Sequence, residues 1–231
     1  MGSTRLPGKV LEPIEGRPLV GWTLAAFRAV ATIDEVVLAT TVNREDEPLV
    51  AFAAPLGPVH RGSARDVLGR VWGAARPQSP DIVVRGTADN PFPDPDVIAA
   101  QIDRCVMDGF DYVGTAGWPI GIAAEVARVK ALEAAVTEAI EPADREHVMP
   151  FLYRHPERFR IGALDGPTTT CHPRYTVDTA EDLAFARAVA ARVGHGPPIY
   201  LAELEAVVAA SPELRLLNSD VRQKGWHEVE S

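Results

Sequence analysis

Two cations lie four residues apart near the start of the chain, Arg5 and Lys9, within the segment GSTRLPGK at positions 2–9. Small residues let the backbone approach a ligand closely, and a Pro-Gly pair forms a tight turn. An arginine fork and a lysine point charge beside backbone N–H groups suit a polyphosphate. The alternative is an exposed basic loop without a ligand.

Two carboxylates follow predicted strands. Asp89 comes just after the strand 81–85, and Asp178 ends the strand 175–178, directly before a helix. Ligands of open α/β sheets bind beyond the carboxyl ends of the strands, so the two side chains could meet there. Paired carboxylates with a triphosphate would suit Mg²⁺. The alternative is an Asx-turn at Asp89 and a helix-start charge at Asp178.

Further polar residues could contact an acceptor. Glu125 could reach an acceptor hydroxyl, although an exposed charge at a helix start explains it equally well. Arg145, Glu146 and His147 are adjacent on a short predicted helix. Successive helical residues point in different directions, so these three would serve two surfaces more readily than one site. His147 alone is also typical of a structural histidine.

Composition narrows the class of protein. The chain has 231 residues and a net charge of −9, which argues against a broad nucleic-acid surface. No apolar run approaches the length of a membrane span, and the two cysteines, Cys105 and Cys171, form no disulfide framework. We therefore expect a cytoplasmic protein with one domain over residues 1–217 and a polar tail over 218–231. One His–Cys pair alone does not indicate zinc.

Helical and strand patterns alternate along the chain, which predicts an α/β fold with a doubly wound, mostly parallel sheet and helices on both faces. Asp94 and Thr179 have the residue types of helix N-caps, with Asp182 completing a capping box at the second site. Predicted helices cover 18–31, 44–54, 64–75, 95–108, 126–140, 144–153, 180–193 and 200–210; predicted strands cover 35–40, 58–61, 81–85, 111–114, 160–162 and 175–178.

Six ordered motifs give a more specific indication, and together they span Gly2 to about Val193. They are GSTRLPGKVL, HRGSARDVLGR, DIVVRGTADNPFPDPDVI, DYVGT, REHVMPFLYRHPERFRI and YTVDTAEDL. In this order they resemble the spore-coat-polysaccharide-type cytidylyltransferases, in the wider group that contains CMP-sialic acid and CMP-KDO synthetases.

The resemblance implies a Rossmann-like nucleotidyltransferase fold and transfer of a nucleotidyl group, favouring CMP from CTP, to an oxygen of a sugar acid or related acceptor, with release of pyrophosphate. It implies that Arg5 and Lys9 bind the triphosphate and that Asp89 and Asp178 hold Mg²⁺. It also implies a homodimer, which we expect through residues 115–155. We assign nucleotide binding to Gly2, Ser3, Thr4, Arg61, Gly62, Ser63 and Arg85, and acceptor binding to Glu125, Arg145, Glu146 and His147.

Two departures from the pattern keep alternatives open. Relatives have an apolar strand before the first motif, so we expect the first strand of the sheet to be missing here. Ala88 and Asn90 stand where relatives often have Gly and Cys, which would alter the acceptor pocket. The alternatives are a nucleotidyltransferase using another nucleoside triphosphate on a sugar 1-phosphate, and a non-catalytic relative that serves as a binding subunit.

Overall fold

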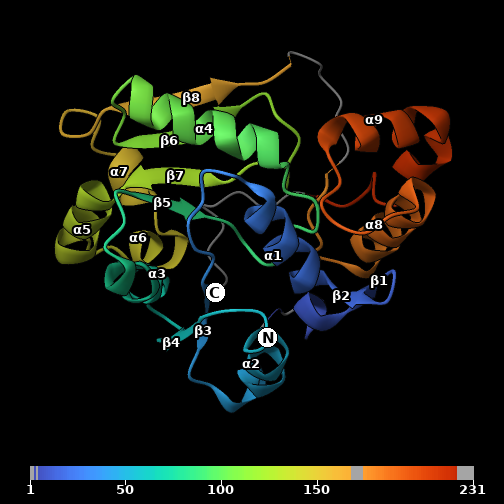
Figure 1. The fold of residues 1–231 in the computed structure, drawn as a ribbon, viewed down its shortest axis with the longest axis horizontal. Coiled ribbons are helices and arrows are strands. Elements are labelled where there is room, and N and C mark those ends of the chain that lie inside the picture. The colour runs from blue at the N-terminus through green and yellow to red at the C-terminus, as the bar shows by residue number, and fades with distance from the viewer. Residues whose placement is uncertain (1–2, 4, 168–173, 223–231) are drawn as a thin grey trace.

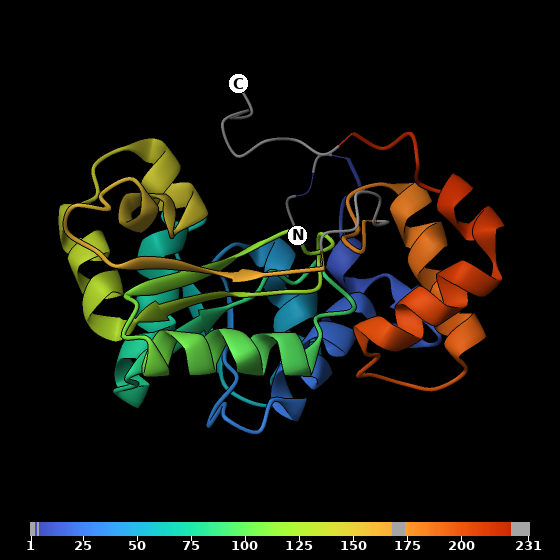
Figure 2. The ribbon, with the colours of Figure 1, turned by 90° about the horizontal axis from the view of Figure 1, so that it is seen from above.

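The computed structural model describes residue 3 and residues 5–167 and 174–222. Figure 1 shows a mixed sheet with helix α4 lying along one face, and a separate helical layer of α8 and α9 at the other end of the molecule. Seen from above, α8, α9 and the N-terminal hairpin lie side by side (Figure 2). The α/β class with helices on the sheet is therefore confirmed.

The largest sheet has the strand order β5-β7-β6-β8. Only the β6–β8 pair is parallel, because β7 runs antiparallel to both of its neighbours. The expectation of a mostly parallel sheet is thus corrected to a mixed one. Its strands are β5 (Ile82–Arg85), β6 (Tyr112–Ala116), β7 (Glu125–Arg128) and β8 (Ile161–Asp165).

Two smaller strand pairs lie outside this sheet. Strands β3 (Leu38–Thr41) and β4 (Val59–Gly62) pair in parallel, as the alternating pattern suggests. Strands β1 (Pro13–Ile14) and β2 (Arg17–Pro18) form a short antiparallel hairpin that the sequence analysis did not predict. In the described part of the chain these pairs are not hydrogen-bonded to the β5–β8 sheet.

Most predicted helices are present, with a few residues of difference at their ends. Asp94 Oδ1 accepts hydrogen bonds from the backbone of Asp96 and Val97, and Thr179 and Asp182 form the predicted capping box. The α-helices are α1 (Leu19–Ala29), α2 (Glu47–Ala53), α3 (Val67–Ala75), α4 (Pro95–Met107), α5 (Val129–Glu138), α6 (Pro142–His147), α7 (Pro150–Tyr153), α8 (Ala180–Val193) and α9 (Leu201–Ala210); the 3₁₀ turns are η1 (Lys9–Leu11), η2 (Arg44–Asp46), η3 (Arg76–Gln78) and η4 (Pro212–Leu216).

The helix predicted over 126–140 is wrong at its start. Residues 125–128 form β7, and the helix begins only at Val129. Val126 and Ala127 are fully buried on opposite faces of a strand that has partners on both sides. A central strand that is buried on both faces lacks the alternation of apolar and polar residues that marks a half-exposed strand. Its apolar residues therefore look like the start of the apolar stripe of the following helix.

The strand predicted over 175–178 is also wrong. This segment has no strand partner, and two single hydrogen bonds hold it: Tyr175 N donates to Ile120 O at 2.8 Å, and Val177 N donates to Asp89 O at 2.8 Å. Tyr175 and Val177 are nevertheless buried in the core beneath α8. The alternation of apolar and polar residues in this segment therefore reflects burial of Tyr175 and Val177, and it does not indicate pairing with a neighbouring strand.

The start of the predicted tail packs against the folded domain. Asn218 is only 5% exposed, and its Nδ2 donates to Arg174 O at 3.2 Å and to Asp182 Oδ1 at 3.1 Å. The folded unit therefore includes Asn218, while residues 223–231 of the predicted tail lie outside the described residues. Among the described residues no helix is long and apolar enough to cross a membrane.

Candidate functional site

Lys9 brings the two predicted metal ligands together. Its Nζ donates to Asp89 Oδ2 at 2.8 Å and to Asp178 Oδ1 at 2.8 Å. The lysine side chain is 11% exposed, so the contact is largely shielded from solvent. Three residues that are distant in the sequence thus converge on one point; the sequence analysis expected the two carboxylates to meet but not their contact with Lys9.

The turn before Lys9 depends on Gly8. Gly8 adopts a φ of 73° and precedes the short 3₁₀ turn η1, which is closed by a 2.9 Å hydrogen bond from Leu11 N to Gly8 O. Glycine reaches this left-handed conformation without the steric cost that a Cβ atom brings. The Pro-Gly turn inferred from the sequence therefore sets the direction in which Lys9 leaves the backbone.

Asp89 lies in a turn just after β5. Asn90 N donates to Thr87 O at 3.2 Å, and the Thr87 hydroxyl donates to Asp89 Oδ1 at 2.5 Å. Thr23 of α1 reaches the same turn, since its hydroxyl donates to Asn90 O at 2.7 Å. The turn leaves Asp89 Oδ2 directed at Lys9, with the carboxylate 26% exposed.

Asp178 is the most heavily contacted acid of the cluster. Arg174 Nη2 donates to its Oδ2 at 2.6 Å, Arg5 Nη2 lies 3.2 Å from the same oxygen, and its backbone N donates to Asp182 Oδ2 at 2.9 Å. Burial alone would raise the pKa of Asp178, but the hydrogen bond and charge of Lys9, together with Arg174 and Arg5, lower it. The carboxylate is therefore held in its charged form.

The cluster fits a divalent cation that is shared with phosphates. Carboxylate oxygens of Asp89 and Asp178 both lie 2.8 Å from the Lys9 nitrogen, so they can face a common cation. Within the described ranges no group of three or more His, Cys, Asp or Glu side chains could hold a metal. Mg²⁺ is commonly bound by one or two carboxylates plus substrate phosphates and water, which matches this two-carboxylate site.

Arg85 and Glu125 form a second cluster. They are register partners on β5 and β7, and an ion pair joins their side chains. Tyr112 of β6 donates its hydroxyl proton to Glu125 Oε1 at 3.2 Å. Burial and the nearby Glu125 charge raise the pKa of Tyr153 to about 12. Burial and Glu125 also raise the pKa of Tyr112, by more than they raise that of Tyr153. Arg85, which was predicted to bind the nucleotide, thus contacts Glu125, which was predicted to bind the acceptor.

The Arg61–Gly62–Ser63 segment, at the end of β4, contacts residues near β3 and its own backbone. Arg61 pairs with Glu47 at 2.6 Å and donates to the carbonyls of Thr41 and Asn43. Ser63 Oγ accepts hydrogen bonds from the backbone N of residues 65 and 66. Arg61 and Ser63 therefore shape the loop, and within the described part of the chain none of their contacts reaches Lys9.

Gly62 has a packing reason of its own. A Cβ atom at this position would lie 3.0 Å from Arg70 Cγ, so the glycine makes room for the arginine of α3. Arg70 in turn donates to Ser63 O. The Arg61–Gly62–Ser63 segment is thus well ordered by contacts with α3, which is compatible with a ligand-facing loop.

The structure does not bring the predicted acceptor residues on α6 to the Lys9 cluster. Arg145 pairs with Asp66 Oδ2 at 3.0 Å and donates to Val136 O at 2.8 Å, so it links α6 to α3 and α5. Glu146 is exposed and His147 is half-buried. This spread matches the expectation that three successive residues would serve more than one surface.

Part of the first motif lies outside the described residues, including Gly2 and Thr4. Ser3 is described, and its Oγ accepts a hydrogen bond from Leu6 N at 3.3 Å. The motif therefore starts as a turn that is stabilised by its own serine, and Arg5 follows with its guanidinium on Asp178.

Sequence reasoning missed Arg174. Its side chain is only 8% exposed, and it contacts both Asp178 and Asp182. The available signal was an arginine at the start of the alternating segment RYTVD, four residues before the aspartate. A cation among buried apolar residues needs an acidic partner, and Asp178 is the nearest in sequence.

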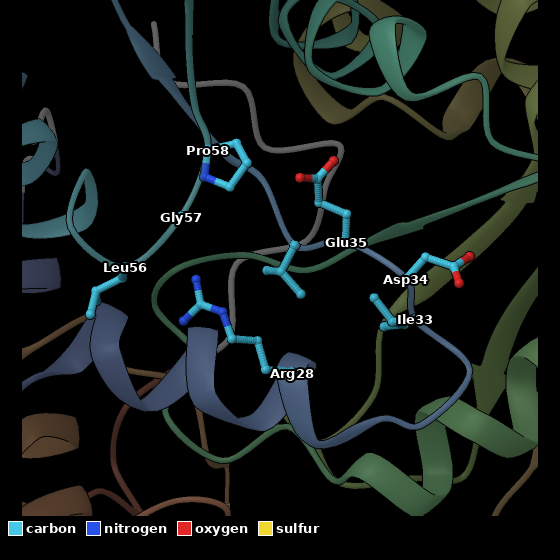
Figure 3. A pocket seen from close by; sticks show the side chains of 8 residues that line it. Arg28, Ile33, Asp34, Glu35, Leu56, Gly57 and Pro58 are labelled. Carbon is cyan, nitrogen blue, oxygen red and sulfur yellow. The ribbon is translucent and has the colours of Figure 1, made fainter.

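A pocket of about 260 Å³ lies elsewhere, and Figure 3 shows it from close by. Its lining residues precede β3 and β4, and they share no member with either cluster described above. Arg28 points from α1 toward Gly57, where an added Cβ would lie 3.2 Å from its Nη2 (Figure 3). The pocket is lined by Arg28, Ile33, Asp34, Glu35, Val36, Leu56, Gly57 and Pro58.

Comparison with known proteins places the chain in a family. A family model described as cytidylyltransferase matches residues 1–218. The chain is 33% identical to an uncharacterized protein of Methanocaldococcus jannaschii, over 99% of this chain and 95% of that protein. It is also 33% identical to a spore coat polysaccharide biosynthesis protein of Bacillus subtilis, over 92% of each chain.

Solved structures agree with this placement. A cytidylyltransferase from Leptospira borgpetersenii matches with a TM-score of 0.87 and 25% identity, over 97% of this chain and 95% of that one. A CMP-KDO synthetase complexed with CTP matches with a TM-score of 0.64 and 18% identity, over 83% of this chain and 95% of that one, which supports the fold alone. The chain is a nucleotidyltransferase enzyme that belongs to the cytidylyltransferase family.

Proposed function

We propose that this chain transfers CMP from CTP to an oxygen of a sugar acid or a related small acceptor and releases pyrophosphate. The observation that carries the proposal is the convergence of Asp89, Asp178 and Lys9 on one point, within the residues that the family matches. Two acids that can hold a metal ion, with a shielded lysine between them, are groups that suit a bound triphosphate.

Asp89 and Asp178 would hold Mg²⁺ in this proposal. When bound, the ion would supply positive charge to the phosphates and help to orient them. The fit rests on the two carboxylate oxygens that face the Lys9 ammonium. Lys9 now occupies these carboxylate oxygens. When Mg²⁺ and the triphosphate bind, the ion would replace Lys9 at the carboxylates, and Lys9 would turn to the phosphates.

Arg5 and Lys9 would stabilise charge on the triphosphate. Both are paired with carboxylates here, and each has a long side chain that could turn to a phosphate oxygen. As the acceptor oxygen attacks the α-phosphorus, negative charge grows on the bridging oxygen and on pyrophosphate. Cations held at that place lower the barrier through electrostatic stabilisation, and no protein nucleophile is needed.

The acceptor would lie toward Arg85 and Glu125. These residues end β5 and begin β7, and Arg85 is four residues before Asp89. A guanidinium and a carboxylate with neighbouring tyrosine hydroxyls can orient a hydroxylated anionic sugar by hydrogen bonds. We also propose that the protein forms a homodimer through residues 115–155. The exposed apolar side chains of Ile120 and Ile140 in that segment support this contact.

Pyrophosphate release tests the proposal. Purified protein with Mg²⁺ and each of CTP, ATP, GTP and UTP is incubated with a panel of sugar acids and sugar 1-phosphates. We expect release with CTP and a sugar acid, and a loss of release in Asp89→Asn and Asp178→Asn. Release with another nucleotide on a sugar 1-phosphate would reassign the substrates. No release with any pair, from protein that is shown to be folded, would contradict the proposed transfer.

A further inference from the structure

Arg174 is buried beside the proposed metal ligand Asp178. The arginine side chain is 8% exposed, and its Nη2 donates to Asp178 Oδ2 at 2.6 Å. Its Nε lies 3.5 Å from Asp182 Oδ1. A buried guanidinium of this kind is costly to desolvate, so the two carboxylates that surround it must compensate.

The partners of Arg174 are themselves fixed. Asp182 Oδ2 accepts hydrogen bonds from the backbone N of Asp178 and Thr179, and so forms the capping box of α8. Asn218 donates to Asp182 Oδ1 and to the carbonyl of Arg174. The helix start, the C-terminal segment and Arg174 thus form one polar network behind Asp178.

In this network the two carboxylate oxygens of Asp178 contact different partners. Oδ2 accepts a hydrogen bond from the Arg174 guanidinium and also lies 3.2 Å from Arg5 Nη2, whereas Oδ1 faces the Lys9 ammonium and, beyond it, Asp89. A carboxylate with one oxygen tied cannot rotate freely about its last bond. Oδ1 is therefore kept directed at the point where Lys9 and Asp89 meet.

We propose that Arg174 is a positioning residue, which fixes the Asp178 carboxylate so that its Oδ1 stays directed at the metal. The inference rests on the proposed function, in which Asp178 holds the metal. Arg174 itself contacts neither the metal nor the nucleotide in this account. Nε and Nη1 of Arg174 make no hydrogen bond among the described residues, so the Nη2 bond to Asp178 and the ion pair with Asp182 are the contacts that orient it.

The first test measures binding of Mn²⁺ with CTP to Arg174→Met and Arg174→Lys, by electron paramagnetic resonance of free Mn²⁺. Loss of a residue that orients a metal ligand typically weakens metal affinity by about 10–100-fold, and we expect this for the methionine variant. Lysine keeps the charge but cannot contact Asp178 and Asp182 together, so we expect an intermediate affinity.

A matched variant separates positioning from general loss of stability. Leu183 lies on α8 in the adjacent core and is 4% exposed, so Leu183→Ala destabilises the same helix without touching Asp178. We expect Leu183→Ala to lower the midpoint of urea unfolding while it keeps the wild-type Mn²⁺·CTP affinity per folded molecule. Equal losses of affinity in Arg174→Met and Leu183→Ala would overturn the inference, and so would unchanged affinity in Arg174→Met.

A double-mutant cycle tests the contact without any nucleotide. The unfolding midpoints of Arg174→Met, Asp178→Asn and the double variant are compared with the wild type. We expect the double variant to shift less than the two single shifts added together, and strictly additive shifts would overturn the inference. Wild-type protein that binds no Mn²⁺·CTP would count against the proposed function alone, and the cycle would then decide the role of Arg174.

Discussion

Arg85 and Glu125 face each other directly across β5 and β7, and their side chains form an ion pair. The contact joins a residue predicted to bind the nucleotide to one predicted to bind the acceptor. It lies on two neighbouring strands of the mixed sheet, one of which sequence analysis had assigned to a helix. The antiparallel direction of β7 is therefore what creates this pair.

Glu125→Gln tests the acceptor role of that pair. The amide keeps the size but removes the charge that Arg85 and the Tyr112 hydroxyl contact. We expect a higher KM for the acceptor, with little change in CTP affinity, and a stability loss of about 1–2 kcal/mol. Glu138→Gln is the control, because its ion pair with Arg158 is exposed and screened by solvent, so its loss should barely change stability. An unchanged KM for the acceptor would remove Glu125 from the site.

Lys9→Met tests whether the ammonium and a divalent cation compete for the same carboxylates. The variant leaves Asp89 and Asp178 without the cation that now separates them. We expect Mn²⁺ to bind this variant more tightly than the wild type when no nucleotide is present, by about tenfold or more, since close carboxylates without a cation repel each other.

The same variant should bind CTP more weakly, because it lacks a cation for the phosphates. Titrations with Mn²⁺ alone and with CTP alone give the two affinities separately. If Lys9→Met binds Mn²⁺ no better than the wild type, then the two carboxylates do not form the metal site.

Gly8→Ala tests the turn that directs Lys9. A residue with a Cβ pays about 1–2 kcal/mol for a left-handed conformation such as the φ of 73° at Gly8. We expect a loss of stability of that size and weaker CTP binding. Gly196→Ala is the matched control, since nothing lies within 4 Å of its added Cβ and its φ is not positive. Equal effects of the two substitutions would contradict the role of the turn.

Asp46 predicts a pH dependence of stability. The carboxylate is 2% exposed and accepts hydrogen bonds from Thr40 and from the backbone and hydroxyl of Thr41. Burial raises the pKa of Asp46, but these hydrogen bonds lower it well below its usual value. Its contribution to stability is therefore complete above the unfolded pKa of about 3.9, and is lost as the pH falls through the lower folded pKa.

Urea unfolding at a series of pH values measures this effect in the wild type and in Asp46→Asn. We expect the variant to be less stable near pH 7 and to lose less stability below about pH 4, because it has no carboxylate to protonate there. Parallel curves for the two proteins would show that Asp46 does not carry this dependence.

Local signals predicted much of the fold. Asp94 with Pro95, and Thr179 with Asp182, mark helix starts through side-chain chemistry that acts within a few residues, and the structure confirms both. The meeting of Asp89 and Asp178 was expected from the sequence, although Asp178 follows an irregular segment and not the predicted strand, and the contact of both with Lys9 was not expected.

What the sequence could not reveal depends on contacts between distant segments. Strand β7 is set by partners on both sides, and its buried Val126 and Ala127 fit a helical stripe equally well. The network of Arg174 and Asn218 joins residues 44 positions apart. Local pattern carries no information on such pairs, so the polar contacts behind Asp178 became visible only in the folded chain.

The most direct test of the account is calorimetric titration of CTP into the wild-type protein, with and without Mg²⁺, and into Asp89→Asn and Asp178→Asn. If Asp89, Asp178 and Lys9 form the nucleotide site, CTP binds the wild type with an affinity that Mg²⁺ increases, and both variants lose that increase. An affinity that is unaffected by Mg²⁺, or variants that respond to Mg²⁺ as the wild type does, would contradict the account.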